Sequence, residues 1–177
     1  MSRPRTLVLF DVDGTLIDSQ SHILGAMEFA FKARDLVSPP ASEILAIVGL
    51  SLSEAFAQLC PETDSQERVL LVEAYKDSFA SLRELVSASP LYLGALECLD
   101  RLKNMDDIVL RIANGKSRRG LCHVLSNPDL AGRFATTQVA DDHPSKPHPS
   151  MALQAMAESG AVRGVMIGDT TFDMQMG

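Results

Sequence analysis

The sequence has few cysteines and no long apolar run. Its three cysteines, Cys60, Cys98 and Cys122, are odd in number and lack the spacing of metal ligands, so we interpret them as reduced thiols. No apolar run approaches the ~20 residues that a membrane helix needs. Only four apolar residues separate the basic amino terminus from Asp11, which is too short for the core of a signal peptide. We therefore expect a cytoplasmic protein with no membrane partner.

Positive charge is also scarce. The 16 lysines and arginines are outnumbered by 23 aspartates and glutamates, which gives a formal net charge of −7. This balance disfavours nucleic acid and anionic membranes as partners. It leaves a small phosphorylated substrate possible, because a metal ion or a local cation can reverse the sign within a site. At 177 residues, 46% of them hydrophobic, the chain is long and apolar enough to bury a core.

Two aspartates follow the first apolar run. Leu7–Phe10 has the continuous apolar character of a strand in a parallel sheet that helices cover on both faces. Asp11 and Asp13 then lie on a turn marked by Gly14, at the carboxyl end of this strand. Ligands of open α/β sheets bind at that edge. A solvated turn is the alternative, because aspartate and glycine are common turn residues.

A helical region separates this strand from the rest of the sheet. Apolar residues recur at helical spacing between residues 19 and 89, and a capping box at Ser51 and Glu54 opens one of these helices. The three expected apolar stripes contain Ile23, Met27, Ala30 and Phe31; Leu52, Ala55, Phe56 and Leu59; and Val69, Val72, Tyr75, Phe79, Leu82 and Val86. We expect them to form the core of a small helical bundle.

Strands and helices alternate after residue 89. We expect a helix over Ala95–Leu102, a strand over Ile108–Ala113 ending at Asn114 and Gly115, and a helix over Arg118–Leu125. The remaining expected elements are a strand near Phe134–Val139, a helix from Pro149 to Gly160, and a strand over Val165–Ile167. Together with Leu7–Phe10, this order predicts an α/β fold with a doubly wound, Rossmann-like parallel sheet.

Four short motifs in this order resemble the haloacid dehalogenase superfamily, and within it the phosphoglycolate phosphatase-like members. The motifs are Asp11-Val-Asp-Gly-Thr-Leu16, Ile112-Ala-Asn-Gly-Lys-Ser117, Ser145-Lys-Pro-His-Pro149 and Gly168-Asp-Thr-Thr-Phe-Asp173. The resemblance implies a catalytic core formed by residues 1–18 and 90–177. It also implies that residues 19–89 are an inserted helical cap domain that closes over the site and selects the substrate.

The resemblance assigns roles to the acidic residues. Asp11 would be the nucleophile that forms an aspartyl phosphate, and Asp13 the general acid and base. Mg²⁺ would bind Asp11, the backbone carbonyl of Asp13 and Asp169, with Asp173 in support, because this ion prefers oxygen ligands. A carboxylate favoured by the dipole of the next helix is the other interpretation of Asp173.

Cations and amides complete the expected site. Lys146, on a proline-rich loop, would balance the charges of aspartate and phosphate, and Asn114 with Gly115 would bind phosphate. Asn114 departs from the second motif, where the family has threonine or serine, and its longer amide can still donate hydrogen bonds. Arg111 interrupts an apolar strand, so we expect it to pair with an acid or to lie at a strand end.

We therefore predict a Mg²⁺-dependent phosphatase that acts on a small-molecule phosphate monoester, with phosphoglycolate as the leading substrate. A pyrophosphatase, and a phosphate-binding or interaction protein with little or no catalysis, remain alternatives. Similar proteins continue past the fourth motif with another strand and helix, whereas this sequence stops at Gly177. We expect an incomplete chain, in which the strand Val165–Ile167 becomes an exposed sheet edge. The protein would be a monomer or a homodimer.

Overall fold

Within the part of the chain that the structure describes, the sheet has four parallel strands. The computed structural model describes residues 4–85 and 89–177, and for residues 80–85 it describes the backbone alone. The strands lie in the order β3-β2-β1-β4. Their bounds are β1 Thr6–Phe10, β2 Ile108–Asn114, β3 Thr137–Val139 and β4 Arg163–Ile167. The central strand β1 pairs with both β2 and β4, so its carboxyl end lies in the middle of the sheet edge.

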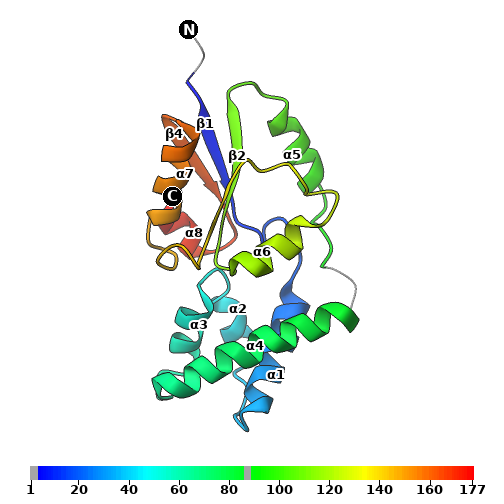
Figure 1. Ribbon diagram of the computed structural model, residues 1–177, viewed down its shortest axis with the longest axis vertical. Coiled ribbons are helices and arrows are strands. Elements are labelled where there is room, and N and C mark those ends of the chain that lie inside the picture. The colour runs from blue at the N-terminus through cyan, green and yellow to red at the C-terminus, as the bar shows by residue number, and fades with distance from the viewer. Residues whose placement is uncertain (1–3, 86–88) are drawn as a thin grey trace.

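Helices cover both faces of the sheet. Val8 and Phe10 of β1 pack in one hydrophobic cluster with Leu99 of α5 (Ala95–Lys103) and Leu121 of α6 (Arg118–Leu125). On the opposite face, Leu7 and Leu9 pack with Met151 of α7 (Ser150–Ser159) and Met176 of α8 (Thr171–Met176). Successive strand residues point to opposite faces, so this arrangement buries all of β1. The predicted doubly wound α/β fold is confirmed (Figure 1).

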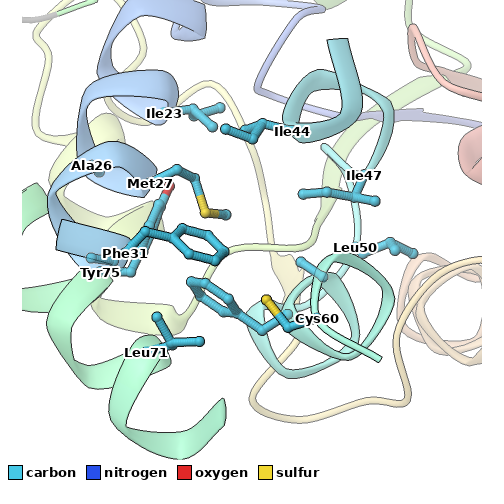
Figure 2. Close-up of a cluster of buried hydrophobic side chains, with 13 residues drawn as sticks. Ile23, Ala26, Met27, Phe31, Ile44, Ile47, Leu50, Cys60, Leu71 and Tyr75 are labelled. Carbon is cyan, nitrogen blue, oxygen red and sulfur yellow. The ribbon is translucent and has the colours of Figure 1, made fainter. Parts of the chain in front are cut away.

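Among the described residues, four helices form a separate bundle beyond the carboxyl edge of the sheet (Figure 1). They are α1 Gln20–Ala33, α2 Ala41–Ala46, α3 Leu52–Leu59 and α4 Ser65–Leu85. Their core contains Met27, Phe31, Phe56, Leu71 and Tyr75. The close-up of Figure 2 shows Met27, Phe31 and Leu71 pointing toward one another. This cluster gives the bundle a core of its own. Burying one such side chain contributes about 1.5–3 kcal/mol to stability.

The helical stripes are mostly as predicted. Ser51 caps α3 by accepting a hydrogen bond from the Glu54 N–H. The prediction that Val69 belongs to the core is wrong, because this residue lies on the outer face of α4 with 59% of its surface exposed. The side chain of Leu82 and the whole of Val86 lie outside the described residues. The strand expected from Phe134 is also too long, since β3 begins only at Thr137.

Arg111 of β2 has an acidic partner on α7. Its Nη1 lies 2.9 Å from Glu158 Oε2, although the arginine is only 5% exposed. Thr136, Gln154 and Gln138 also donate to Glu158, and together with Arg111 they lower the pKa of this carboxyl to about 2. The expected pairing is confirmed, because an ionised glutamate compensates the buried guanidinium.

β4 lies at an edge of the sheet within the described residues, as expected for Val165–Ile167. Val165 is more than half exposed there. Across the described part of the chain, no helix combines the length and the apolar character needed to cross a membrane.

Candidate active site

The predicted site residues gather at the carboxyl ends of the strands. Asp11 follows β1, Asn114 ends β2, and Asp169 comes two residues after β4. Lys146 reaches the same edge from the loop between β3 and α7. Parallel strands end on the same side of a sheet, which brings residues far apart in the sequence within contact.

Asp11 is fully buried, and its two carboxylate oxygens differ in their hydrogen-bond partners. Its Oδ1 accepts hydrogen bonds from Asn114 Nδ2 and from Lys146 Nζ, each at 2.8 Å. Among the described residues, Oδ2 has no hydrogen-bond partner. Burial raises the pKa of Asp11 to about 7, with Asp173 and Asp13 adding to the increase and Lys146 opposing it. An unpartnered buried carboxylate oxygen is costly and commonly marks an ion or ligand position.

Lys146 is only 2% exposed and lies between two carboxylates. Its ammonium donates to Asp11 Oδ1 at 2.8 Å and to Asp173 Oδ1 at 2.6 Å. Burial alone would lower the pKa of Lys146, but these two anions raise it above its usual value. The lysine therefore stays charged, and two aspartates far apart in the sequence are held around it.

Asp173 also caps the helix that carries it. Thr170 and Asp173 form a capping box at the start of α8, in which Asp173 Oδ2 accepts from the Thr170 N–H and hydroxyl. The side chain thus uses one oxygen for the helix and the other for Lys146. Both interpretations of Asp173, as a site residue and as a residue at the helix N-terminus, have support in this geometry.

Three carboxylates could hold a metal ion. Asp11, Asp169 and Asp173 each offer one oxygen, and these oxygens lie within 4.8 Å of one another. Carboxylate oxygens suit a hard divalent cation such as Mg²⁺. The unpartnered Oδ2 of Asp11 fits the same assignment, because a cation would satisfy the atom that the protein leaves unpaired.

Asp13 lies in a different environment from Asp11. Ser19 Oγ donates to its Oδ1 at 2.6 Å, and Lys116 Nζ lies 2.9 Å from its Oδ2. The sequence reasoning missed both partners. Lys116 comes two residues after the end of β2, and its position beside Asn114 was the available signal.

Gly14 allows Asp169 to approach the aspartate turn. Its φ is +79°, and a Cβ built there would overlap the Asp169 carboxylate. Thr15 Oγ1 donates to the same carboxylate at 3.0 Å. The turn therefore both positions Asp169 and leaves room for it.

We expect Gly14→Ala to destabilise the protein by about 1–3 kcal/mol more than Gly94→Ala. Gly94 has a similar φ of +82° but nothing within 4 Å of its built Cβ. Both variants share the strain of a left-handed alanine, so the difference isolates the overlap with Asp169. Urea unfolding of the two variants measures it, and equal midpoints would contradict the close packing.

The helical bundle touches the sheet edge at Gly115. A Cβ built on Gly115 would lie 2.5 Å from the carbonyl oxygens of Gly49 and Leu50, so only glycine fits this contact. Nearby, the Ser51 N–H donates to Ser145 Oγ at 2.8 Å. Between bundle and sheet lies a cavity of about 140 Å³, here called the Asp13 cavity. It is lined by Asp13, Asn114, Lys116 and apolar side chains of the bundle.

Comparison with known proteins identifies the family. The model of the haloacid dehalogenase-like hydrolase family matches residues 8–177. A protein of Dickeya dadantii named "Probable phosphatase IndB" is 36% identical over 97% of this chain and 76% of its own. The pyrophosphatase PpaX of Oceanobacillus iheyensis is 29% identical, over 96% of this chain and 77% of its own. A phosphoglycolate phosphatase of Rhodobacter capsulatus is 26% identical, over 95% of this chain and 77% of its own.

Solved structures share the fold. A hydrolase from Pseudomonas syringae superimposes with a TM-score of 0.83 at 25% identity, over 97% of this chain and 78% of its own. A haloacid dehalogenase-like family hydrolase from Streptococcus pneumoniae gives 0.79 at 23% identity, over 97% of this chain and 80% of its own. The chain belongs to the haloacid dehalogenase-like hydrolase family.

Proposed function

We propose that this protein is a Mg²⁺-dependent phosphatase that hydrolyses a small-molecule phosphate monoester through an aspartyl phosphate. The observation that carries the proposal is the buried Asp11, with one oxygen fixed by Asn114 and Lys146 and the other without a partner. Its position beside Asp169 and Asp173 supports metal binding at the same place. The named phosphatases among the relatives support the reaction class.

In the first step, one carboxylate oxygen of Asp11 attacks phosphorus and the bond from phosphorus to the ester oxygen breaks. Asp13 gives its proton to the departing alcohol. In the second step, Asp13 takes a proton from water, whose oxygen attacks phosphorus and releases inorganic phosphate and the free Asp11 carboxylate. Ser19 and Lys116 hold Asp13 in place for both proton transfers.

The site supplies positive charge for this chemistry. Asp11, Asp169, Asp173 and the Asp13 backbone carbonyl would hold Mg²⁺, which neutralises phosphate charge when bound. Lys146 already provides a buried cation beside Asp11. A carboxylate has several lone pairs, so Asp11 can bind a metal and react with phosphorus. In this scheme Asn114 orients Asp11 and, with Gly115, faces the phosphate.

The helices α1–α4 would serve as the cap that residues 19–89 were predicted to form. Their contacts with the core at Gly115 and Ser145 place the bundle over the carboxyl edge of the sheet. This position suits a cap that excludes water from the site. Function in the cytoplasm as a monomer or homodimer stays a prediction from the sequence.

The names of the relatives suggest phosphoglycolate first and pyrophosphate second as substrates. In a panel of small phosphate esters that also contains both compounds, at least one member should release inorganic phosphate when Mg²⁺ is present. Chelation should stop the release, and added Mg²⁺ should restore it. A folded preparation that binds phosphate but hydrolyses no member of the panel would favour the phosphate-binding alternative.

A further inference from the structure

The Asp13 cavity begins where the departing alcohol would lie. Asp13, the proposed proton donor to that alcohol, lines the cavity together with Asn114 and Lys116. A phosphate bound beside Asp11 would therefore direct its ester group into this space. The shape and chemistry of the cavity then determine which alcohols can be accommodated.

Apart from Lys76, the side chains that the bundle contributes to the cavity are mostly apolar. The bundle side is lined by Met27, Val48, Leu52, Tyr75 and Phe79. Several residues of the cavity lining belong to the cluster drawn in Figure 2. These side chains come from four different segments of the bundle. Because these side chains lie together next to Asp13, the cavity suits the binding of a hydrophobic group.

The cations of the cavity are poorly placed to receive a second anionic group. Lys116 is already paired with Asp13 and lies 5.0 Å from the centre of the Phe79 ring. Lys76 is exposed and pairs with Glu73. Arg119 is exposed as well. A carboxylate placed among the apolar side chains would lose its water without gaining a buried cation of its own.

The volume indicates how large a group the cavity can bury. An apolar cavity of about 150 Å³ can hold one benzene molecule, so the 140 Å³ here suits about five or six carbon atoms. Resting on the proposed phosphatase activity, we propose that the substrate is a phosphate monoester of an alcohol with a compact, uncharged apolar group of this size. Phosphoglycolate, which carries a carboxylate in that position, is then a poor substrate.

The test compares four esters under the same conditions: methyl phosphate, propyl phosphate, isopentyl phosphate and phosphoglycolate. Removing one methylene from water is worth ~0.8 kcal/mol, so kcat/KM should rise about fourfold for each carbon added up to isopentyl. Isopentyl phosphate should also be hydrolysed faster than phosphoglycolate. Equal or higher kcat/KM for phosphoglycolate would overturn the proposal while leaving the phosphatase activity established.

Two variants connect the preference to the cavity. Val48→Thr keeps the side-chain shape but replaces a methyl group with a hydroxyl, and should lower the ratio of kcat/KM for isopentyl phosphate to kcat/KM for methyl phosphate about fivefold or more. Val48→Phe fills part of the space and should move the optimum to shorter chains. Val69→Thr makes the same Val-to-Thr substitution at an exposed position of α4 and should change kcat/KM for neither ester.

These outcomes separate the two proposals. If no ester in the series is hydrolysed with Mg²⁺ present, the proposed function fails. If the esters are hydrolysed but Val48→Thr lowers kcat/KM equally for methyl and isopentyl phosphate, the assignment of the cavity to the alcohol group fails.

Discussion

Asp11→Asn should lower turnover by about 10⁴-fold or more while leaving the fold intact. The amide cannot form the aspartyl phosphate, yet it has the size of the carboxylate and can still accept from Asn114 and Lys146 through its oxygen. Release of inorganic phosphate from the best ester of the panel measures the effect. Undiminished turnover would rule out Asp11 as the nucleophile.

Asp18→Asn is the matched control. Asp18 lies seven residues further along the chain and its side chain is exposed, so the same substitution should leave turnover close to that of the wild type. Loss of activity in both variants would point to a general effect on this segment. Retention in the control would assign the loss to the buried carboxylate.

The same pair of variants tests the ionisation of Asp11. Burial raises its pKa from 3.8 to about 7, so the folded protein holds this proton more tightly than the unfolded chain. Without metal, wild-type stability should therefore fall as the pH rises from about 4 through 7. The melting temperatures measured in chelator at pH 5 and at pH 8 should differ less for Asp11→Asn than for the wild type or Asp18→Asn.

The sheet and the position of its site follow from the sequence alone. Leu7–Phe10 is apolar at every position, as a strand covered on both faces must be, and the structure buries each of these residues. Once that strand is placed, Asp11 has to emerge at its carboxyl end. The same argument places Asn114 and Asp169 at one edge.

The partners of these residues could not be predicted in the same way. Lys116 pairs with Asp13, and Ser19 donates to the same carboxylate. The position of Lys116 just after β2 indicates the edge of the sheet at which it lies, but not this contact. Each of the two contacts depends on the path of a turn and on the rotamer of a flexible side chain. The prediction for Val69 failed for a different reason: Leu71 and Tyr75 face the core of the bundle, whereas Val69 lies on the outer face of α4.

The Asp13 cavity could likewise not be predicted from the sequence. Its lining comes from separate helices and from the loop after β2, which meet only after the bundle docks on the core. Phosphoglycolate was predicted from the resemblance of the motifs to one subgroup, but these motifs describe the phosphate end of a substrate. The other end would contact the apolar side chains of the bundle, which no motif contains.

Lys146→Met should be the most destabilising substitution in the site, with a loss of about 3–5 kcal/mol near pH 8. The apolar side chain is of similar length, but Asp11 and Asp173 would be left buried without their cation. Urea unfolding at pH 8 and at pH 5 measures the loss. It should be smaller at pH 5, where Asp11, with a pKa already raised to about 7 by burial, takes up a proton more easily.

Lys103→Met provides the control, because Lys103 is exposed in the last turn of α5 and its loss should change stability by about 0.5 kcal/mol or less. The double variant Lys146→Met with Asp173→Asn is the sharper comparison. Removing one of the two stranded anions should recover part of the lost stability, since the single variant suffers from uncompensated charge. If the double variant is instead less stable than Lys146→Met by the full effect of Asp173→Asn alone, the two residues do not interact, and the buried cation would not be what holds the aspartates together.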